Sequence, residues 1–304
     1  MLIEITRAAD ENHMLVFIAK IPPDGVVYRS YKPMEVTMTL ISVEEYANLP
    51  GVVPDATLPY GEDDNQYVNL YLPPTVGIHP VVVMLHGGCW REQYSAKPLG
   101  SICRALADAG YAVWNIEYRR ANGVYPQLLL DVAQATDMLR TVETTYQLDL
   151  GRVITVGHSA GGQLALWLAG RHRLSTTSPV YSPDPLPIQG VVCLAGVIDL
   201  VNAVVQGICE GGLTTIMGGT PEAVPDHYQN ASPMALLPLG VRQIHIVGDN
   251  DDNMANVQPY LEAAAAAGDN VQLIVPANTG HFEVVVTSTP AWNTVLEAVN
   301  ELQR

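Results

Sequence analysis

The sequence predicts an α/β protein with a mostly parallel central sheet that is flanked by helices. From about Tyr67 onward, short runs of β-branched residues alternate with longer stretches in which apolar residues recur every three or four positions. The short runs are continuously apolar, as expected for strands that are buried on both faces of a sheet. Among the 304 residues, 48% are hydrophobic and only 15% are charged, which is sufficient for a large core.

Six segments are predicted as core strands and five as covering helices. The strands are expected at 81–85, 111–118, 153–156, 191–194, 244–247 and 271–275. The helices are expected at 96–109, 126–146, 160–171, 257–267 and 290–303. Two regions interrupt this alternation. Residues 174–187 are rich in Ser, Thr and Pro and indicate a surface connection, whereas residues 201–239 lack a clear period and are a candidate cap over a site.

The first 60 residues form an N-terminal extension to a domain that spans residues 61–304. Strands are expected around 14–19, 26–31 and 35–41, and Ser42-x-x-Glu45 matches a capping box that opens a short helix. Such an extension could act as a lid or as an arm to a second subunit, so the sequence is compatible with a homodimer.

Charge and cysteine content exclude several classes of function. Lys and Arg number 15 against 31 Asp and Glu, and the net charge of −16 disfavours nucleic acid and anionic membranes as partners. The histidines lack metal-ligand spacing, so neither a metal nor another cofactor is expected. The apolar run at 14–19 is too short for a signal-peptide core or a membrane span, which favours a soluble cytoplasmic protein. The cysteines lack C-x-x-C spacing and are expected to be free thiols (Cys89, Cys103, Cys193 and Cys209).

The clearest chemical motif is the G-x-S-x-G pattern at residues 157–161. It follows the predicted strand 153–156 and precedes a helical stretch, which is the context of a tight turn that exposes a nucleophilic serine. Glycine on either side lets strand and helix pass closely, because glycine has no Cβ. Ser159 is therefore the candidate nucleophile, and the N–H of Ala160 at the helix start is a candidate donor to an oxyanion.

A second motif, His-Gly-Gly-Cys-Trp at residues 86–90, comes directly off the predicted strand 81–85. Glycines leave backbone N–H groups free to point into a cavity. The segment therefore predicts a second set of oxyanion donors, supplied from a loop distant in sequence from Ser159.

A serine hydroxyl needs a nearby imidazole to remove its proton, and the imidazole needs a carboxylate to orient it. His281 follows the last predicted strand, and an acidic loop follows the strand at 244–247. Asp251 is the favoured acid, with Asp249 and Asp252 as alternatives in the same turn. The order serine, acid, histidine is typical of this sheet architecture.

Two further residues are candidates for the substrate pocket. Trp90 could line its acyl side, although packing in the core is the commoner place for a tryptophan. His158 is expected to pack or hydrogen-bond within the serine turn rather than to act as the base, because neighbouring side chains on such a turn diverge.

From about Tyr60 to the C-terminus, the chain resembles the α/β-hydrolase superfamily. Within it, HGGCW is similar to the HGG-aromatic-Trp pattern of kynurenine formamidases and related small carboxylesterases. Three further segments resemble the same group: GHSAGG at 157–162, Asn-Ala-Ser-Pro at 230–233 and Gly-His-Phe at 280–282.

The resemblance implies a mechanism without a cofactor, with Ser159 as nucleophile, Asp251 as acid and His281 as base. Similarity to the hormone-sensitive-lipase-like branch implies the backbone N–H groups of Gly88, Cys89 and Ala160 as oxyanion donors. The sequence departs from the pattern in two places. Cys89 stands where an aromatic residue or a third glycine is commoner, and Met-Ala at 254–255 replaces the Val-Pro that often follows the acid.

These features together predict a serine hydrolase that cleaves a small carboxylic ester through an acyl-enzyme intermediate. Hydrolysis of an N-formyl aryl amide is a close alternative, because it uses the same steps. An acyltransferase, a peptidase and a non-catalytic binding protein are the remaining alternatives, since the fold alone does not select among them.

Overall fold

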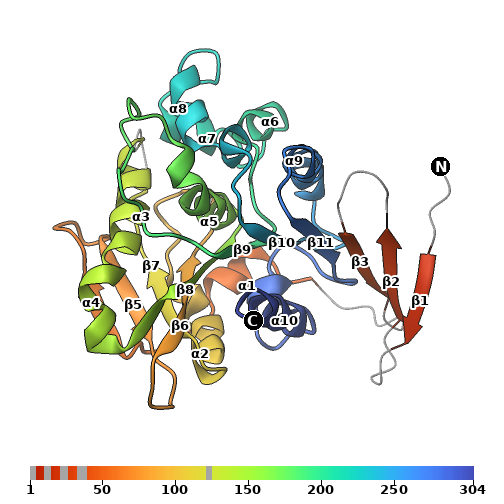
Figure 1. Ribbon diagram of the computed structural model, residues 1–304. Coiled ribbons are helices and arrows are strands. Elements are labelled where there is room, and N and C mark those ends of the chain that lie inside the picture. The colour runs from red at the N-terminus through yellow and green to blue at the C-terminus, as the bar shows by residue number, and fades with distance from the viewer. Residues whose placement is uncertain (1–4, 10–14, 21–26, 33–39, 121–124) are drawn as a thin grey trace.

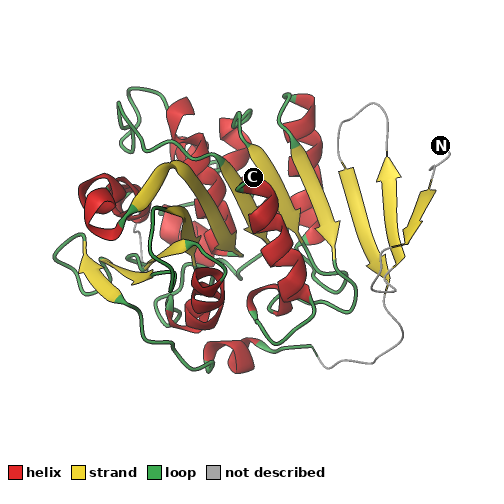
Figure 2. Cartoon of the chain, turned by 60° about the horizontal axis from the view of Figure 1, so that its bottom comes forward, coloured by secondary structure: helices red, strands yellow, loops and turns green. Residues whose placement is uncertain are grey.

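An eleven-stranded sheet runs through the protein and carries helices on both faces of its central part (Figures 1 and 2). The computed structural model describes residues 5–9, 15–20, 27–32, 40–120 and 125–304. The strands are β1 (Ile5–Ala9), β2 (Leu15–Lys20), β3 (Val27–Lys32), β4 (Ala56–Pro59), β5 (Tyr67–Tyr71), β6 (His79–Leu85), β7 (Ala112–Ile116), β8 (Leu148–His158), β9 (Gly190–Leu194), β10 (Arg242–Ile246) and β11 (Val271–Val275).

The strand order across the sheet is β1-β2-β3-β11-β10-β9-β8-β6-β7-β5-β4. Neighbours from β3 to β7 in this order pair in parallel, and only the strands at the two edges pair antiparallel. The mostly parallel sheet that the sequence predicts is therefore confirmed.

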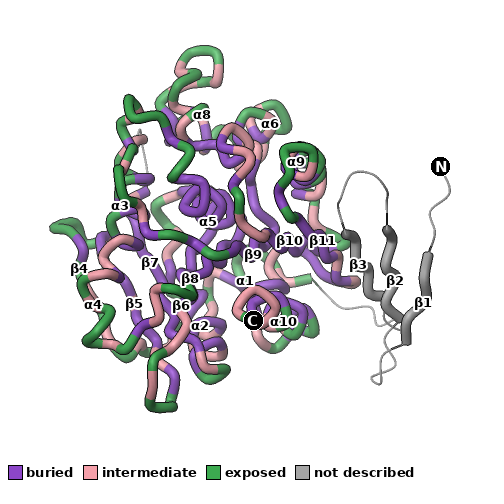
Figure 3. Tube along the Cα trace, viewed as in Figure 1, coloured by how far each residue is buried: buried purple, intermediate pink, exposed green. Residues whose placement is uncertain are grey.

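Successive side chains of a strand point to opposite faces of the sheet, and those of the central strands are apolar on both faces. Helices therefore cover each face of the central strands. On β6, Val81, Val83 and Leu85 pack in the core beneath α3 (Gln127–Asp137), α5 (Ala160–Gly170) and α9 (Met254–Ala266). Val82 and Met84 pack in the core beneath α2 (Gly100–Asp108) and α10 (Ala291–Leu302). Figure 3 shows the buried strands between these two layers. The α-helices are α1 (Val43–Ala47), α2 (Gly100–Asp108), α3 (Gln127–Asp137), α4 (Leu139–Tyr146), α5 (Ala160–Gly170), α6 (Leu200–Val205), α7 (Gly212–Met217), α8 (Pro225–Ala231), α9 (Met254–Ala266) and α10 (Ala291–Leu302).

The six core strands and five helical regions predicted from the pattern are all present. The region predicted as one helix at 126–146 forms two helices, α3 and α4, which meet at Met138. The cap candidate at 201–239 contains three short helices, α6, α7 and α8, and a 3₁₀ turn, Pro233–Leu236. Further 3₁₀ turns occupy Lys97–Leu99, Arg171–Arg173 and Glu283–Val285.

The N-terminal extension adds strands to one edge of the sheet. β3 pairs in parallel with β11, and β2 and β1 continue outward as an antiparallel meander. The strands expected at 14–19 and 26–31 correspond to β2 and β3, whereas the one expected at 35–41 lies almost wholly outside the described residues. The predicted capping box is present: Ser42 Oγ accepts the Glu45 N–H, and the Glu45 carboxylate accepts the Ser42 N–H at the start of α1.

Candidate active site

The candidate nucleophile stands on a sharp turn between β8 and α5. Ser159 has φ 56° and ψ −120°, a region that L-residues rarely occupy. The neighbouring glycines are required by space. A Cβ at Gly157 would lie 2.0 Å from the Gly161 carbonyl oxygen, and a Cβ at Gly161 would lie 2.2 Å from the Leu85 carbonyl oxygen. The G-x-S-x-G spacing therefore lets α5 pass directly against β6 and β8.

The loop after β6 lies directly against this turn. A Cβ at Gly87 would lie 2.9 Å from the Ser159 Cβ, and Gly88 has φ 110° with the Tyr94 side chain 2.4 Å from where a Cβ would stand. Among the described residues, the N–H groups of Gly88, Cys89 and Ala160 have no hydrogen-bond partner. The loop and the start of α5 thus bring three unpaired donors to the neighbourhood of Ser159.

The expected acid and base pair with each other. His281 Nδ1 lies 2.8 Å from Asp251 Oδ2, and the Asp251 side chain is only 4% exposed. Its other oxygen, Oδ1, accepts the Asn253 N–H at 2.9 Å. Burial acts to raise the pKa of Asp251, but the hydrogen bond and charge of His281 and the Asn253 N–H outweigh it, so the net pKa is lowered. Asp251 is therefore an ionised partner for the imidazole.

The two neighbouring carboxylates have other positions. Asp249 accepts the Thr279 N–H at 3.0 Å and the side-chain amide of Asn250 at 2.7 Å, and Asp252 is exposed. Neither bonds to His281 among the described residues. Of the three acids that the sequence left open, only Asp251 contacts the ring.

Ser159 and His281 both line the same two cavities. The first, of about 330 Å³, is lined by aromatic and apolar side chains that include Tyr46, Tyr94 and Phe282. The second, of about 290 Å³, is bordered by Asp251 and the exposed acidic loop. Among the described residues Ser159 Oγ makes no hydrogen bond to His281. In proteins without substrate, catalytic hydrogen bonds are often long and shorten only when substrate binds.

His158 lies beneath the histidine loop. Its Nε2–H donates to the His281 carbonyl oxygen at 2.8 Å, and the two rings lie 4.7 Å apart. Burial lowers the pKa of His158 to about 3, so the ring is neutral near neutral pH. His158 also lines the larger cavity, but through its main-chain contact it supports the loop of His281.

Trp90 is buried, and its indole N–H donates to Gln163 Oε1 at 3.3 Å. It borders a third cavity, of about 220 Å³, together with Arg91 and Ile216. That cavity shares Cys89 with the two that Ser159 lines, but Trp90 is not among the residues that line those two.

The prediction that all four cysteines are free thiols is wrong for two of them. Cys89 and Cys209 form a disulfide across 120 residues of sequence, with their Cα atoms 5.5 Å apart. Cys103 and Cys193 are free and buried. The pairing depends on the fold, because the cap candidate at 201–239 brings Cys209 to the glycine loop, and no local spacing predicts it.

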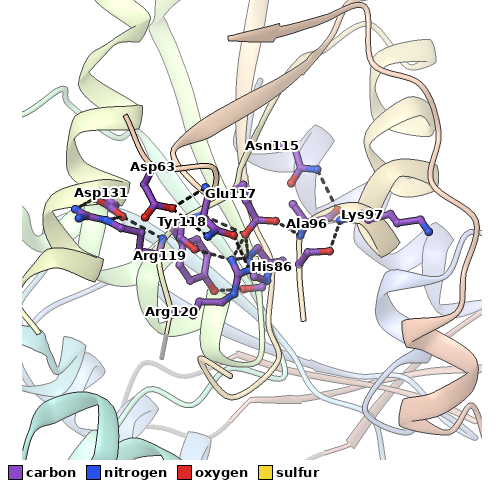
Figure 4. Close-up of polar contacts among 12 residues, drawn as sticks. Asp63, His86, Ala96, Lys97, Asn115, Glu117, Tyr118, Arg119, Arg120 and Asp131 are labelled. Carbon is purple, nitrogen blue, oxygen red and sulfur yellow. Dashed lines mark hydrogen bonds and ion pairs between the residues drawn. The ribbon is translucent and has the colours of Figure 1, made fainter. Parts of the chain in front are cut away.

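Sequence reasoning missed a buried polar cluster that anchors the glycine loop (Figure 4). Glu117, directly after β7, accepts hydrogen bonds from His86 Nε2 at 3.0 Å, from the Ala96 N–H at 2.9 Å and from Arg120. The Tyr118 hydroxyl donates to the His86 carbonyl oxygen at 2.7 Å. The available signal is the Glu-Tyr-Arg-Arg run at 117–120, because charged residues that directly follow a buried strand need partners.

Sequence reasoning also missed the contribution of the N-terminal segment. Val43 and Tyr46 of α1 line the larger cavity, and the Tyr46 ring stacks on Phe282 at 4.8 Å. The buried Glu283 joins the two regions, because its carboxylate accepts the N–H groups of Ile41 and Gly280. The extension therefore forms one wall beside the histidine loop.

No helix in the described part of the chain is long and apolar enough to cross a membrane. Across those same residues, no group of three or more His, Cys, Asp or Glu side chains could hold a metal ion.

Comparisons with known proteins show that this chain is similar to hydrolases of the α/β-hydrolase fold. Residues 68–261 match the model of the BD-FAE family. The kynurenine formamidase of Salmo salar is 26% identical over 235 residues, covering 75% of this chain and 74% of the relative. Esterase LipI of Mycobacterium tuberculosis is 27% identical over 252 residues, covering 76% of each. Esterase B of Lactobacillus rhamnosis shares the fold, with a TM-score of 0.70 at 22% identity over 84% of this chain and 88% of that one.

Proposed function

Because the chain belongs to the BD-FAE family and is a hydrolase of the α/β-hydrolase fold, we propose that it cleaves small carboxylic esters with Ser159 as nucleophile. The observation that carries this proposal is the His281–Asp251 hydrogen bond beside the cavities that Ser159 lines. An oriented, carboxylate-paired imidazole next to a serine that lines a cavity is the arrangement that activates a hydroxyl.

In the proposed reaction, Ser159 Oγ attacks the ester carbonyl while His281 Nε2 accepts its proton. Asp251 keeps the proton on His281 Nδ1 and stabilises the imidazolium that forms. The N–H groups of Gly88, Cys89 and Ala160 receive the oxyanion of the tetrahedral intermediate. His281 then donates its proton to the leaving alcohol, and a water molecule hydrolyses the acyl-enzyme by the same steps.

Hydrolysis of an N-formyl aryl amide is the second candidate, favoured by the similarity to the kynurenine formamidase of Salmo salar. The aromatic lining of the larger cavity suits a ring in either kind of substrate. The two candidates differ in the leaving group, which is an alcohol in one case and an arylamine in the other. Comparing kcat/KM for p-nitrophenyl acetate and N-formylaniline decides between them.

The test of the proposed mechanism begins with Ser159→Ala. This variant should keep the folded circular dichroism spectrum and lose at least about 10³-fold in kcat, together with labelling by a fluorophosphonate. Retained turnover in the folded variant would refute Ser159 as nucleophile.

The acid is tested by a matched pair of substitutions. Asp251→Asn should lower kcat by about 10⁴-fold, because an asparagine cannot hold the imidazole in its required tautomer. Asp252→Asn removes an equal charge one residue away, where no bond to His281 exists among the described residues. Its kcat should exceed that of Asp251→Asn by at least about 100-fold, and equal losses in both variants would contradict the assignment.

A further inference from the structure

The Cys89–Cys209 disulfide joins the two sides of the candidate active site. Cys89 belongs to the glycine loop, where its N–H is one of the three unpaired donors beside Ser159, and Cys209 belongs to the cap between α6 and α7. The bond therefore fastens a loop from the centre of the sheet to a segment that is not part of it.

Both cysteines of the disulfide also line the two cavities. Four residues are common to both of them: Cys89, Cys209, Ser159 and His281. The disulfide therefore forms part of the lining of both cavities that the proposed nucleophile, Ser159, lines.

Both ends of the disulfide have a backbone conformation that needs support. Cys89 and Trp90 have φ angles of 52° and 54°, and Cys209 and Glu210 have φ angles of 64° and 48°. Residues other than glycine rarely adopt such angles, and they persist only where the surroundings hold them. Two consecutive residues of this kind on each side make both loops prone to relax when released.

Within the described part of the chain, Arg91 makes further polar contacts between the two loops, of which the ion pair with Glu210 is exposed. Arg91 donates to the Cys209 carbonyl oxygen at 3.0 Å and pairs with Glu210 at 3.2 Å, with side chains 36% and 88% exposed. Exposed ion pairs hold a geometry weakly. The covalent bond is therefore the strongest connection that this structure provides between loop and cap.

We propose that Cys209 is a positioning residue, whose bond to Cys89 holds the Cys89 N–H where the oxyanion forms, so that cleavage of the bond slows the chemical step. This inference rests on the proposed function of Ser159. A displacement of about 1 Å in a catalytic group can lower a rate by about 100-fold. The proposal therefore predicts a fall in kcat of roughly 10- to 100-fold.

The bond makes this positioning sensitive to reductants. A dithiol such as dithiothreitol transfers two electrons and two protons to the disulfide, which becomes the two thiols of Cys89 and Cys209, while the reductant becomes a cyclic disulfide. Disulfides are typical of oxidising compartments and persist poorly in a reducing cytoplasm. The proposed activity should therefore depend on the redox state of its surroundings.

The experiment compares wild type, Cys209→Ser and Cys103→Ala with a p-nitrophenyl ester, each with and without dithiothreitol. The reductant should lower wild-type kcat by roughly 10- to 100-fold with at most about a 3-fold change in KM, and reoxidation should restore it. Cys209→Ser should have the low kcat in both conditions. Cys103→Ala removes a buried thiol that takes no part in the disulfide, and it should respond to the reductant as wild type does.

Thiol titration of the unfolded, unreduced wild type fixes the starting state, with two free thiols expected out of four cysteines. Four free thiols, an unchanged kcat in folded Cys209→Ser, or a change confined to KM would each overturn the positioning role. Failure of the proposed function is separate, because it appears as Ser159-independent turnover in the oxidised wild type.

Discussion

Two buried histidines should make the fold sensitive to acid. Burial lowers the pKa of His245, on β10, to about 3, and His158 has a similar pKa for the same reason. In the unfolded chain a histidine titrates near 6.5. Between about pH 6.5 and 3 the unfolded state therefore binds protons that the folded state does not, and the free energy of unfolding falls as the pH decreases.

The size of the effect follows from the difference in pKa. Each pH unit below 6.5 and above the folded pKa costs about 1.4 kcal/mol per histidine. At pH 5, some 1.5 units below the unfolded pKa, each ring should therefore remove about 2 kcal/mol from the free energy of unfolding relative to pH 7.5.

His245→Gln isolates one of these contributions. Gln cannot be protonated, and it can keep a polar contact with Gln243, which lies 3.3 Å from His245 Nε2. Urea unfolding at pH 7.5 and pH 5 should show a loss between the two pH values that is smaller in the variant by about 2 kcal/mol. His172→Gln, which replaces an exposed histidine, serves as the control and should lose as much as wild type. An equal loss in His245→Gln and wild type would refute the reasoning.

Three further substitutions test the packing around the site. Gly161→Ala places a Cβ 2.2 Å from the Leu85 carbonyl oxygen, so we expect a loss of at least about 1–3 kcal/mol in unfolding free energy, measured in urea, together with a lower kcat. Glu117→Gln leaves the Arg120 guanidinium, only 4% exposed, without its anion, and should cost about 3–5 kcal/mol by the same assay; a loss below 1 kcal/mol would contradict the buried pair. Tyr46→Ala removes an aromatic wall of the larger cavity and should raise KM for aryl esters more than for acetate esters of small alcohols, whereas equal changes would place the aryl group elsewhere.

The central fold could be predicted because its signals are local. The apolar strand at 81–85, and the glycines that flank Ser159, each report a requirement of the few residues around them. A strand buried on both faces needs continuous apolar residues, and a helix that passes close to a strand needs residues without a Cβ. Ser159 and His281 could be proposed as candidates for the same reason, since each follows a recognisable strand.

The rest depends on contacts between distant segments. The cap candidate lacked a readable period because α6, α7 and α8 have six or seven residues each, which is fewer than two helical turns. Asp251 could not be separated from its neighbours by spacing, because the path of the turn decides which carboxylate reaches the ring. The disulfide and the Tyr46 wall each join segments that only the folded chain brings together.

The hydrogen bond from the Ile41 N–H to the Glu283 carboxylate connects the N-terminal extension to the histidine loop. The stretch shared with the BD-FAE family, residues 68–261, contains the serine but stops before His281 and starts after α1. A protein shortened to start at residue 68 would leave the Glu283 carboxylate with one oxygen unbonded to Ile41 and the larger cavity open on the side of Val43 and Tyr46. Exchanging the N-terminal segment for that of a relative would therefore change one wall of the larger cavity and leave Ser159, Asp251 and His281 unchanged.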